Sequence, residues 1–148
     1  MATVRVQEAP FDMGAEVDAF AKGRTDMGAL VTFTGVVRDL ADSDLSVMEI
    51  EHYPGMTERA IGKIVDEAVT RWSLGDALVI HRYGRMGPGD RIMMVATAAP
   101  HRVDAFAAAE FLMDYLKSRA PFWKKEITSD GADWVAATDE DEAALGRW

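Results

Sequence analysis

The chain alternates between short stretches rich in β-branched residues and two longer stretches with helical periodicity. In residues 56–72 the apolar side chains recur at the 3-4 spacing of an amphipathic helix with one wide buried face. A second helix is predicted over residues 102–119, before Pro121, because proline lacks a backbone donor and disfavours helix in the preceding residue. A brief helical pattern over residues 17–21 and a terminal helix in the acidic tail from Asp139 accompany these two main helices.

Strands are predicted where β-branched and aromatic residues dominate or alternate with polar ones. The predicted strands are residues 4–6, 28–37, 47–53, 77–83, 91–98, 124–128 and 134–137. Gly35 indicates a bulge or a close backbone approach. A polar loop at 41–46 would join its two flanking strands into a β-hairpin, and the glycine-rich residues 84–90 would form a plain connecting loop. This order predicts an α+β domain with a mostly antiparallel sheet.

Composition narrows the class of protein. A length of 148 residues fits one domain, spanning residues 1–148. There is no cysteine, so a disulfide, a thiolate metal site and a thiol nucleophile are excluded, and any sulfur chemistry needs sulfur from another molecule. The N-terminus lacks a signal pattern and no apolar run is long enough to span a bilayer, which predicts a cytoplasmic protein without a membrane partner. The net charge of −9 disfavours binding to nucleic acid.

One short stretch reverses this acidic balance. Residues 117–125 contain Lys117, Arg119, Lys124 and Lys125 but no acid. On a helical wheel Lys117 lies at the margin of the buried face of the predicted helix. Two interpretations stay open: a solvated helix end whose cations favour the helix dipole, or a lysine that loses its proton readily among apolar and cationic neighbours. The second would make it a nucleophile or a proton shuttle.

Other polar residues are candidates for binding an anion. His101 and Arg102 begin the second helix, where backbone N–H groups attract negative charge, although they could equally be ordinary residues of a helix start. Arg38 follows a predicted strand and is either a surface arginine or a phosphate-binding fork. His52, His81 and His101 lack the mutual spacing of metal ligands, so neither a metal nor a bound cofactor is expected.

Many stretches of the chain are similar to one family, the large catalytic subunit of molybdopterin synthase. The matching stretches are residues 28–38 (GALVTFTGVVR), 51–58 (EHYPGMTE), 71–75 (RWSLG), 80–84 (IHRYG), 101–106 (HRVDAF), 113–126 (MDYLKSRAPFWKKE), 130–135 (DGADWV) and 147–148 (RW). They cover most of the chain in order, which makes them far more specific than any single short motif. The resemblance implies an α/β-hammerhead-like fold, compatible with the predicted α+β domain.

The resemblance also implies an activity and its partners. The enzyme would convert cyclic pyranopterin monophosphate (precursor Z) into molybdopterin by installing two dithiolene sulfurs. The sulfur donor would be a small ubiquitin-like subunit whose C-terminal Gly-Gly tail, activated as a thiocarboxylate, enters a pocket of the large subunit. Two large subunits would pair as a homodimer, giving a heterotetramer with two small subunits.

The same resemblance assigns roles to residues of this chain. It places the catalytic lysines at Lys117 and Lys124. Lys117 would act nearest the thiocarboxylate carbonyl, as proton donor or transient acyl acceptor, while Lys124 would stabilise developing negative charge or the substrate. The residues implied to hold the phosphate are Arg38, His101 and Arg102, and those implied to shape the tail tunnel or the pterin pocket are Phe33, Met113 and Phe122.

One position departs from the family pattern. Some members place an arginine shortly after the Trp134-Val135 pair, reaching the active site of the partner protomer, whereas this chain has Ala136, Ala137 and Thr138.

Two other functions remain as alternatives. One is a non-catalytic module that docks a Gly-Gly-tailed protein, and the other is a phosphate-ester enzyme that acts without a partner. Retention of both lysines and of the His-Arg pair argues against the first.

Overall fold

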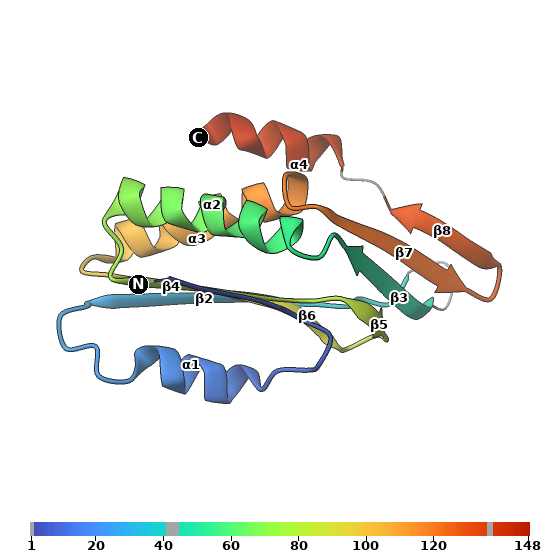
Figure 1. Cartoon of the computed structure of the whole chain (residues 1–148), viewed down its shortest axis with the longest axis horizontal. Coiled ribbons are helices and arrows are strands. Elements are labelled where there is room, and N and C mark those ends of the chain that lie inside the picture. Colours follow the sequence, from blue (N-terminus) through green and yellow to red (C-terminus); the bar gives the residue numbers. More distant parts are fainter. Residues whose placement is uncertain (1, 41–44, 136–137) are drawn as a thin grey trace.

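The strands form two sheets, and the second extends beyond one end of the first (Figure 1). The computed structural model describes residues 2–40, 45–135 and 138–148. The first sheet has the strand order β1 (Ala2–Gln7), β4 (Asp76–Arg82), β6 (Arg91–Ala99) and β2 (Ala29–Val36). The second has the order β5 (Gly84–Met86), β3 (Leu45–His52), β7 (Phe122–Thr128) and β8 (Gly131–Val135). Only β1 and β4 pair in parallel among these strands, which confirms the predicted α+β class with mostly antiparallel sheets.

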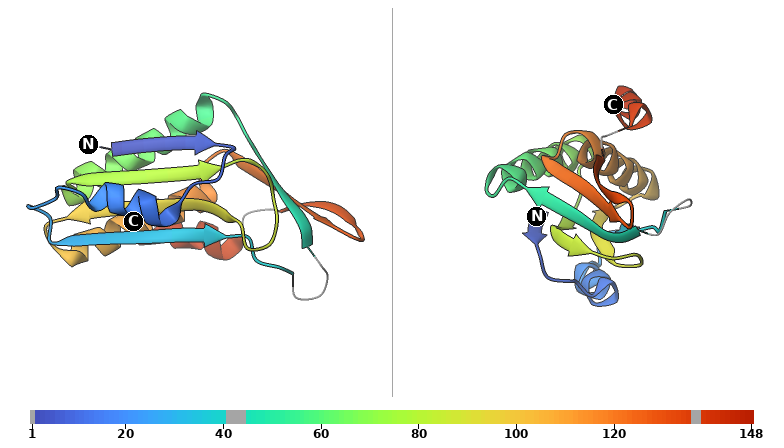
Figure 2. Two further views of the ribbon diagram at one scale, coloured as in Figure 1. Left: turned by 90° about the horizontal axis from the view of Figure 1, so that it is seen from below. Right: turned by 90° about the vertical axis from the view of Figure 1, so that its right-hand side faces the viewer.

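Helices cover both faces of the first sheet (Figures 1 and 2). The two long helices, α2 (Met56–Trp72) and α3 (Arg102–Ser118), lie on one face, and α1 (Met13–Ala21) lies on the other. A short helix α4 (Asp139–Ala144) and a 3-10 turn (Leu145–Arg147) follow β8 and pack against α3. Within the described parts of the chain, no helix is long and apolar enough to cross a membrane.

The central strands β4 and β6 are apolar on both of their faces because both faces are covered. In β6 every residue from Ile92 to Ala99 is buried. The apolar faces of α2 and α3 pack onto one side of this pair, contributing fully buried side chains such as Ile61 and Phe111. The other side holds a smaller cluster that includes Phe20 of α1 and Met94 of β6. The continuous apolar run in β6 is therefore typical of a strand enclosed between two layers of helices.

The end of the chain is anchored to α3. Arg147 donates two hydrogen bonds to the carboxylate of Asp114, each of 2.9 Å, and the indole nitrogen of Trp148 donates to the same group at 2.6 Å. The Trp148 ring packs edge-on against Phe111 and Trp72, with centroid distances of 5.6 and 5.5 Å. These contacts hold the C-terminal segment over the outer side of α3.

Most predicted elements are confirmed, but one pairing is wrong. The predicted hairpin between residues 28–37 and 47–53 does not form, because β2 pairs with β6 in the first sheet while β3 pairs with β5 and β7 in the second. The loop predicted at 41–46 lies outside the described residues over 41–44, as does the end of the predicted strand 134–137 over 136–137.

Two local features of the strands bear on the loop and bulge predictions. The loop predicted at 84–90 contains the short strand β5, which the sequence analysis missed, because the chain leaving β4 runs alongside β3. The register of β2 against β6 shifts between Gly35 and Val36, so the predicted bulge at Gly35 is confirmed. That irregularity lies in the part of β2 that lines the cavity described below.

A single buried threonine fixes the turn between α3 and β7. The hydroxyl of Thr57, at the start of α2, accepts a hydrogen bond from the backbone N–H of Tyr53 and donates one to the carbonyl of Pro121, both at 3.0 Å. Its side chain is fully buried. Since Pro121 ends α3 and precedes β7, this contact ties the beginning of α2 to the place where the chain turns from helix to strand.

Replacing Thr57 with valine should therefore destabilise the fold. Thr57→Val keeps the shape of the side chain but removes the partner of two partly buried backbone groups, and we expect the free energy of unfolding to fall by about 2 kcal/mol. Thr57→Ser is the matched control, because it keeps the hydroxyl and loses one methyl group, at a cost of about 1 kcal/mol. Urea denaturation measures both. A valine variant no less stable than the serine variant would contradict this role for the hydroxyl.

Candidate functional site

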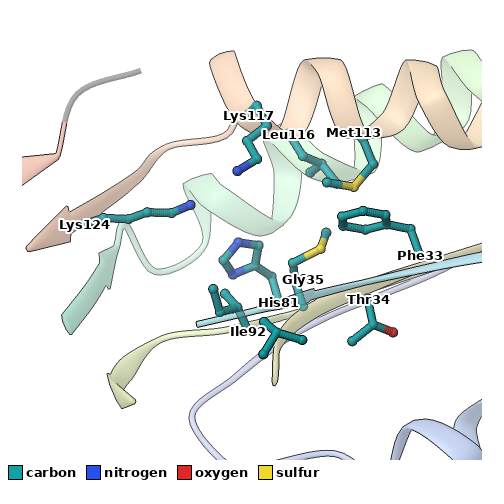
Figure 3. A pocket seen from close by; sticks show the side chains of 11 residues that line it. Phe33, Thr34, Gly35, His81, Ile92, Met113, Leu116, Lys117 and Lys124 are labelled. Atoms are coloured by element: carbon teal, nitrogen blue, oxygen red, sulfur yellow. The ribbon is translucent and has the colours of Figure 1, made fainter. Parts of the chain in front are cut away.

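A cavity of about 270 Å³ opens where α3, β7 and the ends of three strands of the first sheet come together. Its lining residues are Phe33, Thr34, Gly35 and Val36 of β2, His81 of β4, Ile92 and Met93 of β6, Met113, Leu116 and Lys117 of α3, and Lys124 of β7. Figure 3 shows the two lysine amines pointing into the same space above the ring of His81. The floor and one wall are apolar, and the titratable groups come together at one end.

The chain brings the two lysines together by changing direction between them. Lys117 lies in the last turn of α3, and Lys124 is the third residue of β7. Pro121 separates the two elements and forces the helix to end before it. Strand β7 therefore leaves at an angle, and the side chain of Lys124 points back toward α3. The sequence analysis predicted both the helix end and the position of Lys117 at the margin of the buried face. Leu116 beside it is buried while Lys117 is exposed, which confirms that position.

The site lowers the proton affinity of Lys124. Its pKa is lowered from 10.5 to about 8, first because burial disfavours the charged ammonium and second because the positive charge of Lys117 repels it. The carboxylate of Asp141 in α4 acts in the opposite direction. From the sequence, Lys117 was the lysine that apolar and cationic neighbours would cause to lose its proton readily. The structure applies this argument to Lys124, because the side chain from β7 is the half-buried one.

His81 contributes an uncharged imidazole to the same cavity. The side chain is only 5% exposed, and its pKa is lowered to about 3, chiefly by burial and further by the charges of Lys124, Lys117 and His52. Its Nδ1 lies 2.8 Å from the carbonyl oxygen of Arg82. The ring stacks on Phe122 with a centroid distance of 3.7 Å. His81 is therefore neutral at physiological pH and held rigidly between β7 and the first sheet.

The structure brings together half of the residues predicted for the site. Lys117, Lys124, Phe33 and Met113 all line the cavity. Phe122 does not line it but supports it from behind by stacking on His81.

Three predicted residues lie outside this cavity. Arg38 is exposed two residues beyond Val36, the last cavity residue of β2. His101 and Arg102 are exposed at the N-terminal end of α3, and a rise of 1.5 Å per residue places Arg102 roughly 22 Å from Lys117 along the helix. Within this chain the predicted His-Arg pair is therefore remote from the two lysines.

His81 is the residue of this site that the sequence analysis missed. It was considered only as a possible metal ligand, and among the described residues no group of three or more His, Asp or Glu side chains could hold a metal ion. A usable signal was present in the sequence. A histidine directly follows the apolar run 77–80 of a buried strand, and a polar side chain in such a place needs a partner or a function.

Comparison with known proteins places the chain in a family. Residues 6–119 match the model of the MoaE protein family. The chain is 70% identical over 145 residues to the molybdopterin synthase catalytic subunit of Cereibacter sphaeroides, covering 98% of this chain and 99% of that protein.

Solved structures share the fold. The molybdopterin biosynthesis MoaE protein from Burkholderia ambifaria superposes with a TM-score of 0.86 at 55% identity, covering 100% of this chain and 98% of that one. A chain in the complex of subunits 1 and 2 of molybdopterin-converting factor from Helicobacter pylori has a TM-score of 0.75 at 17% identity, covering 92% and 90% of the two chains, a likeness of fold alone. The chain therefore belongs to the MoaE family, the catalytic subunits of molybdopterin synthase, which act in molybdenum cofactor biosynthesis.

Proposed function

We propose that this chain transfers sulfur from the C-terminal thiocarboxylate of a small ubiquitin-like subunit to cyclic pyranopterin monophosphate, forming the dithiolene of molybdopterin. The observation that carries the proposal is the pair of lysine amines that point into one cavity, one of them with a pKa of about 8. Both the thiocarboxylate and the phosphate ester are anions, so a small cationic cavity in a chain of net charge −9 suits them.

The chemistry of the chain supports an external sulfur donor. The sequence contains no cysteine, so no thiol of this protein can carry the sulfur. In each transfer the sulfur bonds to a substrate carbon while a carbon–oxygen bond at that carbon breaks, and the displaced oxygen takes up a proton. Water then cleaves the carrier's acyl carbon–sulfur bond and supplies the oxygen that leaves the carrier with an ordinary carboxylate. The carrier called subunit 1 in the Helicobacter pylori complex is the kind of partner that this scheme requires.

The two lysines would act differently because their surroundings differ. Lys117 is exposed at the rim, where an entering tail arrives first, and would act nearest the thiocarboxylate carbonyl as proton donor or transient acyl acceptor. Lys124 is half-buried between the cavity and β3 and would stabilise the developing negative charge or the substrate. Phe33 and Met113, which line the apolar wall, would contact the tail or the pterin.

The positions of the residues proposed to bind the phosphate favour a dimer. Arg38 lies near the cavity, but His101 and Arg102 lie at the far end of α3. The edge strand β2 carries the exposed apolar side chains Phe33 and Val36, and α3, which packs beside it, carries Val103 and Phe106, so these two elements form an apolar face. A second copy of the chain covering this face through a two-fold axis perpendicular to α3 would run its α3 antiparallel to the first. The His101-Arg102 pair of one protomer would then approach the lysines of the other, within a heterotetramer that includes two small subunits.

The first test removes the amine at the rim. Lys117→Ala should abolish conversion of cyclic pyranopterin monophosphate by the chain mixed with thiocarboxylated small subunit, with product followed by mass spectrometry. Lys125→Ala is the matched control, because Lys125 does not line the cavity and instead lies 5.1 Å from the centroid of the Trp134 ring. Near-normal turnover by Lys117→Ala would contradict the proposal. Product formed without the small subunit would favour the phosphate-ester alternative.

The second test uses the lowered pKa of Lys124. If its ammonium form stabilises negative charge, kcat/KM should fall as the pH rises through about 8, where Lys124 loses its proton. Lys124→Arg keeps a positive charge at all these pH values and should move this decline upward, whatever its absolute rate. The measurement is a pH profile of both proteins. An identical decline in the arginine variant would assign it to another group.

The third test asks whether the site is completed by a second protomer. Mixed dimers of Lys117→Ala and Arg102→Ala chains, isolated through two different affinity tags, contain one intact site and one doubly altered site if these residues act across the interface. They should regain about half of the wild-type activity, since the two sites of a symmetric dimer are equivalent. If Arg102 acts within its own chain, both sites are damaged and the mixed dimers stay as inactive as the parents.

A further inference from the structure

His81 presents one ring nitrogen to the protein and the other to the cavity. The carbonyl oxygen of Arg82 can only accept, so the contact of 2.8 Å means that Nδ1 carries the proton and donates it. Because burial keeps the ring neutral, Nε2 carries no proton and offers a lone pair. The tautomer of His81 is therefore set by the backbone of its own strand.

The lone pair of Nε2 has no partner in the protein. Among the described residues only Nδ1 of this ring makes a hydrogen bond, although His81 lines the cavity and is 5% exposed. The fully enclosed side-chain atoms without a partner in the described chain are Glu58 Oε1 and Ser118 Oγ, so Nε2 is not sealed in the core. A nearly buried acceptor that is open to a cavity needs a donor from whatever fills that cavity.

The cavity thus offers two kinds of hydrogen-bonding group. Lys117 and Lys124 supply donors that suit anionic oxygen or sulfur, while Nε2 of His81 supplies an acceptor below them. An anion would be repelled by that lone pair and attracted by the amines, whereas a neutral N–H or O–H would favour the histidine. The two ends of a substrate that carries both kinds of group are thereby distinguished.

We propose that Nε2 of His81 accepts a hydrogen bond from a ring N–H or hydroxyl group of the bound pterin phosphate, which makes His81 a substrate-binding residue that orients the pterin toward the lysines. This inference rests on the proposed function, because it takes the pterin as the occupant of the cavity. The stack on Phe122 and the bond to Arg82 hold the ring so that it loses little entropy when the substrate binds.

Two other roles for His81 fit less well. A group with a pKa of about 3 is a weak base, so it would accept little of a proton from the substrate at neutral pH. A role through Lys124 is also disfavoured, because burial and Lys117 lower the pKa of that lysine, Asp141 raises it, and His81 is not among these causes. A rigid, neutral acceptor is the chemistry that remains.

Two amide substitutions separate the nitrogens of the ring. The shorter asparagine amide in His81→Asn mimics Nδ1 and keeps a donor for the Arg82 carbonyl, whereas the longer amide in His81→Gln reaches the position of Nε2 and restores an acceptor in the cavity. We expect His81→Asn to raise KM for cyclic pyranopterin monophosphate about tenfold with little change in kcat, and His81→Gln to stay within about threefold of wild type. The assay supplies thiocarboxylated small subunit in excess. The decline near pH 8 should be unchanged in both variants.

Each outcome of this assay has one meaning. Equal KM values for wild type and His81→Asn would overturn the inference, and so would loss of the decline near pH 8, which would show that His81 acts through Lys124. If the wild-type protein forms no product, the proposed function fails and this inference fails with it. Product from wild type with an unaffected asparagine variant removes the role of His81 alone.

A second measurement needs no substitution. In ¹⁵N-labelled wild-type protein, the imidazole of His81 should show a protonated Nδ1 and an unprotonated Nε2 from pH 5 to pH 8. Adding cyclic pyranopterin monophosphate should shift the Nε2 resonance in the direction of hydrogen-bond acceptance and leave Nδ1 nearly unmoved. An Nε2 resonance that stays in place at saturating substrate would overturn the proposal even if the asparagine variant failed to fold.

Discussion

The candidate site depends on a fold that holds two positively charged lysines around one cavity. Lys117 and Lys124 repel each other, and the repulsion together with burial lowers the pKa of Lys124 to about 8. Like charges in one cavity each disfavour the charged form of the other, so both lysines stay there only because the fold directs their side chains into the same space (Figure 3). Here one lysine is placed by the last turn of α3 and the other by the start of β7, and the hydroxyl of Thr57 ties the turn between those elements to α2. The electrostatics of the site is thus sustained by the packing of the fold.

The remaining parts of the cavity follow from the same arrangement. Because α2 and α3 cover one face of the first sheet, the strand ends that emerge beneath α3 supply an apolar floor from Ile92 and Met93. Burial keeps water from the amine of Lys124, and His81 stays neutral for the same reason. Burial therefore lowers the basicity of both groups, moderately for Lys124 and almost completely for His81. The result is a cavity with positive donors above and an uncharged acceptor below.

Local patterns in the sequence predicted the elements well because each pattern reports its own surroundings. The spacing of apolar residues gave α2 its observed bounds, and Pro121 marked the end of α3 to within one residue. Which strands pair with each other is not decided by local sequence. Residues 28–37 and 47–53 were correctly predicted as strands, but each pairs with strands that are distant in the sequence. The predicted hairpin between them was therefore wrong. Strand β5 was missed because three residues make no recognisable pattern until β3 lies beside them. His81 was missed for a related reason, since its neutrality comes from residues that are distant in the sequence.

The charge distribution explains why this chain can be acidic overall and still handle anionic reactants. With a net charge of −9, the surface repels anions at long range, but that effect is screened beyond about 8 Å at physiological ionic strength. Within the cavity the screening is weaker and the lysine amines dominate. A carrier protein with a flexible anionic tail can satisfy both conditions, since its globular part can contact the chain through other chemistry while only the tail reaches the amines. The absence of cysteine then becomes consistent with the site, because the sulfur arrives on the tail and every group that the chain itself contributes is a donor, an acceptor or an apolar wall.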